Sequence, residues 1–205
     1  MNIFDKKAGV WDEDPERVAR AQRCADRLVD LIEMKQVTRA MEYGSGTGLL
    51  SFALMDRIKD IILMDESEKM TEQALMKCRS GNIKHIRPIQ INLLEDSFDG
   101  PKFDLIYTLL TLHHVQDVSH LLGRFSALMN VGGQLAIIDL EHEDGSFHDH
   151  SQYVHRGFKQ SELENLLDDA GIHPWHYEVA FTIKKSLDGD SKEFPAFLMM
   201  AKKVI

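Results

Sequence analysis

The sequence contains only two cysteines and no long apolar run among its 205 residues. Cys24 and Cys78 each lie within a helical pattern, and neither belongs to a CxxC pair, which argues against structural zinc and thiol exchange. No window approaches the roughly 18 consecutive apolar residues of a membrane helix, and the N-terminal residues lack the apolar centre of a signal peptide. We therefore expect a soluble, cytoplasmic protein with reduced cysteines and no membrane span.

Positive charge is also scarce and dispersed, with 24 Lys and Arg against 33 Asp and Glu and a formal net charge of −9. Binding to a phosphate backbone relies on concentrated positive charge, so we expect no nucleic-acid partner. The chain is long and apolar enough to bury one continuous core, but it has no room for a second folded domain. We expect a single domain over residues 1–205.

Short apolar runs alternate with helical patterns along most of the chain. The helices include one that begins after Ser67 and runs to about Arg79 before Gly81, and one from about Asp117 to Met129. The expected strands are VTRAMEY, DIILMD, HIRPIQIN, FDLIYTLL and GQLAIIDL. This alternation is typical of a doubly wound α/β domain, in which helices cover both faces of a parallel sheet.

Both ends of the chain depart from this alternation. Asp14-Pro15-Glu16 predicts the start of an amphipathic helix within an N-terminal helical flap, residues 1–36. A core over residues 37–140 follows, and it includes a helix over LLSFALMDRI. In residues 141–205, a polar histidine-rich segment precedes SELE, which has the form of a capping box at Ser161. The tail, HYEVAFTIKK and FPAFLMMAKK, predicts an antiparallel β-hairpin.

Three glycines stand at every second position of MEYGSGTGLL, residues 41–50, directly after the first expected strand. Ligands of open parallel sheets bind beyond the carboxyl ends of the strands, and glycines let a backbone turn tightly there and approach a ligand. A dinucleotide fingerprint, G-x-G-x-x-G, requires its third glycine at position 49, where this chain has Leu49. The turn is G-x-G-x-G instead, and Glu42 precedes it.

A carboxylate follows at the next strand end. Asp65 closes the second expected strand, seventeen residues past Gly48, and from there it could accept both hydroxyls of a ribose. A solvated strand-end acid is the alternative, but the pairing with the glycine turn favours the ribose interpretation.

Taken in order, the motifs resemble those of the class I S-adenosylmethionine-dependent methyltransferases, most closely the small-molecule group that includes the ubiquinone and menaquinone biosynthesis enzymes. The motifs are EYGSGTG, ILMDES, IQINLLED, FDLIYTLLTLHHV and VGGQLAIIDL, and the resemblance covers about residues 4–170. It implies a Rossmann-like domain with a mostly parallel seven-stranded sheet, a C-terminal antiparallel hairpin and S-adenosyl-L-methionine as the cofactor.

The resemblance also implies which residues bind this cofactor. Residues of the glycine turn would surround the methionine part of the cofactor, and Asp65 would bind its ribose hydroxyls. Other residues would contact the adenosine and the amino group. The full set is Glu42, Gly44, Ser45, Gly46, Gly48, Asp65, Glu66, Met70, Asn92, Leu93, Thr108 and Leu109. Asn92 departs from the Asp of many relatives, but an amide oxygen can still accept the adenine amino hydrogen. Without the resemblance, ordinary packing would equally explain Met70, Thr108 and Leu109.

Methyl transfer from a sulfonium is an in-line displacement, so the protein mainly positions the acceptor and excludes water. A base is needed only if the acceptor must lose a proton, and the candidates are His113, His114 and His155. His113 and His114 could instead be structural, one holding a loop backbone and the other packed beneath the cofactor. The other histidines of the polar segment are expected to be solvated: His142, His148 and His150.

Two other functions fit parts of the sequence. A nicotinamide-dependent oxidoreductase would share the fold and the ribose acid, but Leu49 and the lack of a Tyr-x-x-x-Lys pair count against it. A non-enzymatic metal-binding protein would use the segment from His142 to His155, with His148, His150 and Asp149 as ligands, but this segment has no cysteines or fixed scaffold. The preferred function is methyl transfer to a small-molecule acceptor without a metal, with Phe4 and Trp11 of the flap either closing over the pocket or packed permanently against the sheet.

Overall fold

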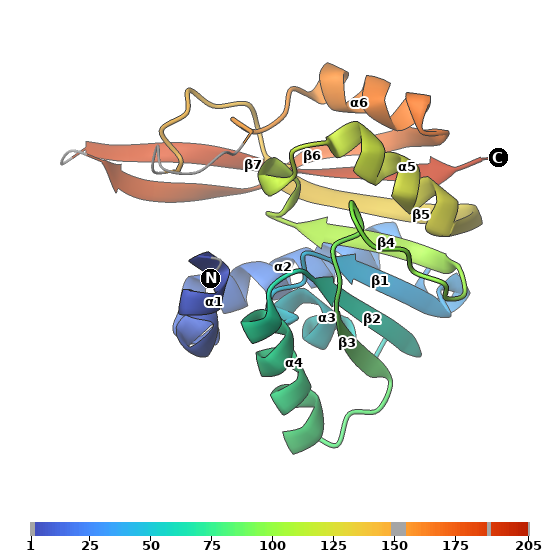
Figure 1. The fold of residues 1–205 in the computed structure, drawn as a ribbon. Helices are drawn as coiled ribbons and strands as arrows, with labels where there is room; N and C mark the ends of the chain where they lie inside the picture. Colours follow the sequence, from blue (N-terminus) through green and yellow to red (C-terminus); the bar gives the residue numbers. More distant parts are fainter. Residues whose placement is uncertain (1–2, 149–154, 188–189, 205) are drawn as a thin grey trace. The chain divides into compact units, whose positions relative to one another are not determined.

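The structure, a computed structural model, describes residues 3–148, 155–187 and 190–204 (Figure 1). Within them, seven strands form one mixed sheet in the order β3-β2-β1-β4-β5-β7-β6. The neighbouring pairs β1 with β2, β1 with β4 and β2 with β3 are parallel, whereas β7 runs antiparallel to both β5 and β6. The Rossmann-like sheet and the C-terminal hairpin predicted from the sequence are therefore confirmed.

The chain forms two compact units, Met1–Tyr107 and Thr108–Ile205, and the boundary falls within β4. This grouping does not test the division predicted at residues 36 and 140, which stays a prediction. No helix in the described ranges is long and apolar enough to cross a bilayer.

The first unit alternates helices and parallel strands. Its helical elements are α1 (Ile3–Lys7), η1 (Ala8–Glu13), α2 (Pro15–Leu31), η2 (Met34–Gln36), α3 (Leu49–Leu54) and α4 (Glu68–Ser80), and its strands are β1 (Arg39–Tyr43), β2 (Asp60–Asp65), β3 (Ile86–Gln90) and most of β4 (Phe103–Leu109). Asp14 caps α2, as predicted, because its carboxylate accepts the Glu16 and Arg17 N–H groups. Ser67 caps α4 in the same way, its hydroxyl accepting the Met70 N–H.

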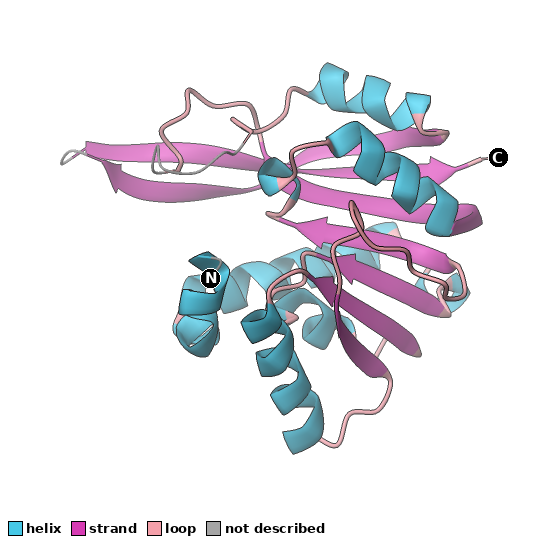
Figure 2. Cartoon of the chain, viewed as in Figure 1, coloured by secondary structure: helices cyan, strands magenta, loops and turns pink. Residues whose placement is uncertain are grey.

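The second unit contains the hairpin and the helices that accompany it. Its elements are η3 (Leu112–His114), α5 (Val118–Leu128), β5 (Met129–Leu140), α6 (Gln160–Asp169), β6 (Ile172–Leu187) and β7 (Asp190–Lys203). Figure 2 shows the long hairpin strands in magenta. Both are longer than predicted, since the pairing runs from Ile172 opposite Lys203 to Leu187 opposite Asp190.

The prediction of a capping box at Ser161 is wrong. The residue that precedes α6 is Lys159, whose side chain makes no capping bond, and Ser161 is the second residue inside the helix. The Lys159 ammonium lies 2.8 Å from the Glu162 carboxylate, an ion pair across the first turn. The helix over LLSFALMDRI is also shorter than predicted: α3 ends at Leu54, where the Arg57 N–H donates to the Leu54 carbonyl in a tight turn.

The segment that follows β5 is tied at both ends by backbone hydrogen bonds. The His142 N–H donates to the Phe158 carbonyl, the Phe158 N–H to the Leu140 carbonyl and the Glu143 N–H to the Arg156 carbonyl, at 2.8–3.0 Å. Gly157 permits this close approach, because a Cβ at its position would lie 2.1 Å from the Glu141 carbonyl oxygen and its φ is +67°. The two ends of the segment are thereby fixed side by side.

Candidate cofactor and histidine sites

The glycine turn lies at the carboxyl end of β1, where the fold places ligands. Gly44, Gly46 and Gly48 all have positive φ, at 63°, 54° and 82°. A Cβ on Gly48 would lie 2.7 Å from Leu63 Cδ1 and 3.1 Å from Phe52 Cε2, so the close packing of the turn on β2 and α3 excludes a side chain there. The glycine turn therefore packs closely on β2 and α3 of the first unit.

Asp65 clamps this turn to the start of α4. One carboxylate oxygen accepts the Gly46 N–H at 2.7 Å, and the other accepts the Ser67 N–H at 2.8 Å. Burial raises the pKa of Asp65, and the two N–H donors oppose that shift. The carboxylate is thus a half-buried link between two backbone segments and not the solvated acid that the sequence left as an alternative.

Glu42 is buried in β1, with 2% of its surface exposed. Its carboxyl oxygen accepts the Ser51 N–H at 3.1 Å and the Ser51 hydroxyl at 2.5 Å, and that hydroxyl lies 2.6 Å from the Tyr107 hydroxyl. Desolvation raises the pKa of Glu42 to about 8, although the Ser51 bonds oppose it. Glu42 is therefore mainly uncharged at neutral pH, and it joins β1 to α3 through Ser51.

The residues predicted for the adenosine moiety lie in the same unit. Met70 is buried in α4, and a Cβ on Gly46 would lie 3.9 Å from its sulfur. Asn92 follows β3, and its side-chain oxygen accepts the Leu94 N–H at 3.0 Å in a local turn that leaves Leu93 fully buried. Glu66 is exposed beside Asp65.

The N-terminal flap contacts the glycine turn. Asp12 of η1 accepts the Thr47 hydroxyl at 2.5 Å and pairs with the Lys77 ammonium at 2.7 Å. Trp11 lies close as well, since a Cβ on Gly46 would be 3.8 Å from its indole nitrogen. Residues 3–13 therefore pack beside the predicted cofactor residues of this unit.

The carboxyl end of β4 begins the second unit. Thr108 is fully buried, and its hydroxyl has no hydrogen-bond partner within the described residues. Two residues later, Leu110 adopts a φ of +52°, rare for a leucine, and its N–H donates to the Ile138 carbonyl at 2.7 Å. The strand end after Thr108 and Leu109 therefore contains a strained backbone conformation.

His113 and Asp139 form a buried pair in the second unit. The His113 Nδ1 lies 2.5 Å from Asp139 Oδ1, and the side chains are 2% and 0% exposed. Asp139 also accepts the backbone N–H groups of His113 and Leu140, and although burial works against ionisation, His113 and these bonds lower its pKa. Sequence reasoning missed Asp139, although an acid within the apolar strand AIIDL was a signal that it needed a buried partner.

Two more imidazoles lie against His113. Its ring centroid is 4.1 Å from that of His114 and 5.0 Å from that of His148, and the His114 and His148 centroids are 4.9 Å apart. Burial and the two neighbouring histidines lower the pKa of His114 to about 3, so its ring is neutral at physiological pH. His148 is thus half-buried in a histidine cluster, which contradicts the solvated position expected for it.

His155 has a different position. Its Nε2 lies 2.8 Å from the Val115 carbonyl, and its backbone N–H donates to the His113 carbonyl at 2.7 Å. Both contacts hold the residues before α6 against η3, a structural role considered from the sequence for His113 or His114 and not for His155. His142 is exposed as expected, whereas Asp149 and His150 lie outside the described residues.

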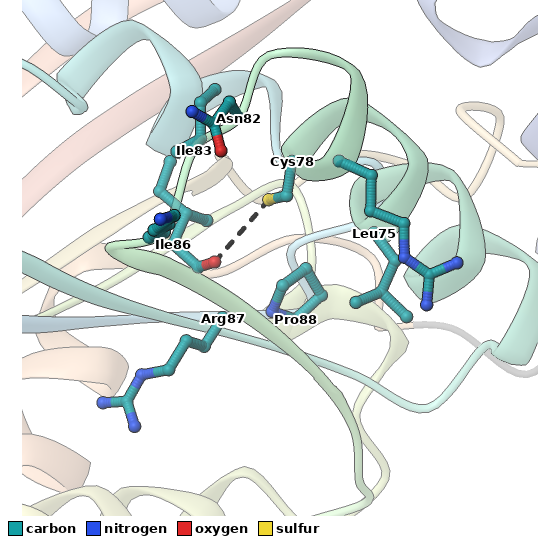
Figure 3. Close-up of a pocket in the computed structure, with 9 residues that line it drawn as sticks. Leu75, Cys78, Asn82, Ile83, Ile86, Arg87 and Pro88 are labelled. Carbon is teal, nitrogen blue, oxygen red and sulfur yellow. Dashed lines mark hydrogen bonds between the residues drawn. The ribbon is translucent and has the colours of Figure 1, made fainter.

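A hollow of about 580 Å³ lies between α4 and the amino end of β3 (Figure 3). Cys78 and Pro88 line it, and the Cys78 thiol donates to the Ile86 carbonyl at 3.6 Å. Ligands of this fold bind at the carboxyl ends of the strands. The hollow is therefore at the wrong end of β3 for the cofactor.

Comparison with known proteins identifies the family of the chain. A family model described as a methyltransferase domain matches residues 17–182. An uncharacterised methyltransferase of Schizosaccharomyces pombe is 27% identical over 148 residues, covering 64% of this chain and 52% of that protein. The 27-O-demethylrifamycin SV methyltransferase of Amycolatopsis mediterranei is 24% identical over 135 residues, covering 64% and 49%. The chain thus spans about half the length of these curated relatives.

A solved structure shares the fold over nearly the whole chain. The Burkholderia thailandensis 1,6-didemethyltoxoflavin-N1-methyltransferase, with 1,6-didemethyltoxoflavin and S-adenosylhomocysteine bound, superposes with a TM-score of 0.73 at 20% identity and covers 99% of this chain and 88% of its own. Such low identity shows the fold alone, but the family match covers most of the chain and favours methyl transfer over the nicotinamide alternative. The chain belongs to the class I S-adenosylmethionine-dependent methyltransferases.

Proposed function

We propose that this protein transfers a methyl group from S-adenosylmethionine to a small-molecule acceptor by in-line displacement. The observation that carries the proposal is the Asp65 clamp, which joins the glycine turn after β1 to the start of α4 through the Gly46 and Ser67 N–H groups. This arrangement brings a carboxylate and a bare backbone together at two adjacent strand ends, as a ribose and its neighbouring amino-acid part require.

The residues present fit this cofactor. Asp65 has lone pairs left for ribose hydroxyls after accepting two N–H groups, and the Asn92 oxygen has one left for an adenine amino hydrogen. Gly46 keeps the backbone bare between the Trp11 indole nitrogen and the Met70 sulfur. When bound, S-adenosylmethionine supplies an activated methyl group on its sulfonium.

A small acceptor is supported by two observations. Two similar proteins are named for small molecules, 27-O-demethylrifamycin SV and 1,6-didemethyltoxoflavin. The net charge of −9 disfavours a polyanionic acceptor. Incubating the protein with labelled S-adenosylmethionine and a metabolite pool, followed by mass spectrometry, would identify the methylated product; labelling confined to protein or nucleic acid would contradict a small acceptor.

Cofactor binding can be tested with two aspartates of one strand. Asp65→Ala removes both the predicted ribose acceptor and the clamp on Gly46, so we expect S-adenosylhomocysteine to bind at least about 10-fold more weakly, because hydrogen bonds to charged groups contribute about 1.5–3 kcal/mol. Isothermal titration measures the affinity. Asp60→Ala is the matched control, since Asp60 begins β2 and pairs with Arg39 and Arg87 at the opposite end of the strand.

The control variant should lose stability without losing affinity. Equal affinities for the wild type and Asp65→Ala would place Asp65 outside the site, and no binding by the wild type would overturn the proposed function.

A further inference from the structure

The histidine cluster of the second unit, formed by His113, His114 and His148, has a geometry that packing alone does not require. Each ring offers one nitrogen, and these three nitrogens all lie within 4.8 Å of one another. The rings come from two separate segments: His113 and His114 from η3 after β4, and His148 from the segment after β5. Three imidazole nitrogens are a ligand set that suits zinc and neighbouring divalent transition metals.

Asp139 fixes the His113 ring in an orientation suited to metal binding. A carboxylate only accepts hydrogen bonds, so the 2.5 Å contact with Nδ1 of His113 assigns the ring proton to Nδ1. Nε2 is then the nitrogen left to bind a metal, and it is buried without a hydrogen-bond partner within the described ranges. A carboxylate behind the distal nitrogen is the usual means by which proteins orient a histidine that binds a metal.

The surroundings of the cluster are apolar on one side. The Phe147 ring lies 4.8 Å from the His148 ring and 6.3 Å from the His113 ring, and it packs on Phe194. Leu140, Phe147 and Phe194 form a buried cluster that shields this side from water. An apolar shell of this kind strengthens metal–ligand bonds and restricts solvent access.

We propose that His113, His114 and His148 bind one divalent transition-metal ion of the zinc class, with Asp139 as the residue that positions His113. Metal–nitrogen bonds of about 2.0–2.1 Å in a tetrahedron separate the nitrogens by roughly 3.3 Å, so the rings must close on the ion. His148 can supply this movement, because it is half-buried and stands on an irregular segment. Three protein ligands leave the fourth position for water or for an oxygen or sulfur donor.

This metal site differs from the one considered from the sequence. That set combined His148 with Asp149 and His150 in one segment, whereas the structure brings His148 to two histidines more than thirty residues earlier in the chain. The inference does not rest on methyl transfer, since metal binding can be measured without S-adenosylmethionine. Failure of one proposal therefore leaves the other standing.

Cobalt(II) is a suitable probe, because four-coordinate Co²⁺ has intense visible bands that aqueous Co²⁺ lacks. We expect the full chain, prepared without a histidine tag and treated with chelator, to bind one equivalent of Co²⁺ with these bands, and Zn²⁺ to remove them. His148→Ala should weaken Co²⁺ binding at least 10-fold, and Asp139→Asn should weaken it roughly 10–100-fold. His142→Ala is the matched control, an exposed histidine of the same segment whose loss should change nothing.

The proposal is overturned if Co²⁺ gives no four-coordinate bands, if His148→Ala binds as the wild type does, or if His142→Ala weakens binding as much. His148→Ala decides the result even if Asp139→Asn fails to fold, because His148 lies outside the helices and strands.

Discussion

Glu42 shows how one side chain can change its chemistry through burial. A glutamate two residues before the first glycine of the turn suggests a negative charge beside the cofactor, yet the fold encloses this carboxyl group and raises its pKa to about 8. Its partners are Ser51 and, through Ser51, Tyr107. The residue therefore acts at neutral pH mainly as an uncharged hydrogen-bonding group, and its predicted place around the methionine part stays a prediction.

The stability of the protein should depend on pH through Glu42. The pKa of Glu42 is raised from 4.5 to about 8 in the folded state. Between these two pH values the folded protein keeps the proton of Glu42, whereas the unfolded chain releases it. The free energy of unfolding therefore falls as pH rises from about 4.5 to 8. At about 1.4 kcal/mol per pH unit, the wild type should lose roughly 3–4 kcal/mol between pH 5 and 8 relative to Glu42→Gln. Urea unfolding at the two pH values measures the difference.

Glu42→Gln is the appropriate comparison, because its amide resembles the protonated acid and cannot ionise. Contributions from other titrating groups cancel between the two proteins. Parallel stability profiles for the two proteins would show that Glu42 ionises normally in the folded state.

At the scale of elements, the predictions succeed where local signals are strong. The strand DIILMD and the helix between Ser67 and Gly81 were predicted almost to the residue, because a fully buried strand and a capped helix are encoded locally. The predicted cap at Ser161 was wrong because a capping-box pattern does not fix where a helix begins: the cap position is Lys159, two residues earlier. The extent of the terminal hairpin was underestimated, since its pairing depends on cross-strand contacts.

The close packing of the glycine turn at the start of α3 can be tested by the stability of a Gly48 variant. Gly48→Ala should lower the free energy of unfolding by about 3 kcal/mol, because alanine is strained at a φ of +82° and its Cβ meets Leu63. Gly123→Ala is the control: Gly123 is exposed inside α5 with nothing within 4 Å of its added Cβ, so alanine should raise stability by about 1 kcal/mol. Chemical denaturation of both variants measures these changes, and a loss of stability in both would contradict this explanation.

At the scale of the whole molecule, the histidine cluster could not be predicted from the sequence. His113 and His114 were candidates because they follow a strand, but nothing local joins them to His148 or reveals Asp139 behind them. These contacts form because the chain after β5 brings His148 next to the histidines of η3. The glycine turn and Asp65 were easier to predict, since adjacent parallel strands bring their carboxyl ends together in every fold of this class.

Cofactor binding should be visible in the unfolding of the whole chain. A ligand present at about 100 times its dissociation constant stabilises the folded state by about 2.7 kcal/mol, and for a chain of this size that corresponds to roughly 5–10 °C in the unfolding temperature. We expect saturating S-adenosylhomocysteine to give such a shift in thermal unfolding. Asp65→Ala should show a smaller shift at the same concentration, and an unchanged wild-type temperature would contradict cofactor binding.

Backbone hydrogen bonds hold the two ends of residues 142–157 together. Since its backbone bonds join residues 140–143 to residues 156–158, a change in the number of residues between them leaves those bonds intact. A replacement of this segment would therefore remove His148, the third metal ligand, and would leave Asp139 and His113, which lie outside it, paired as they are.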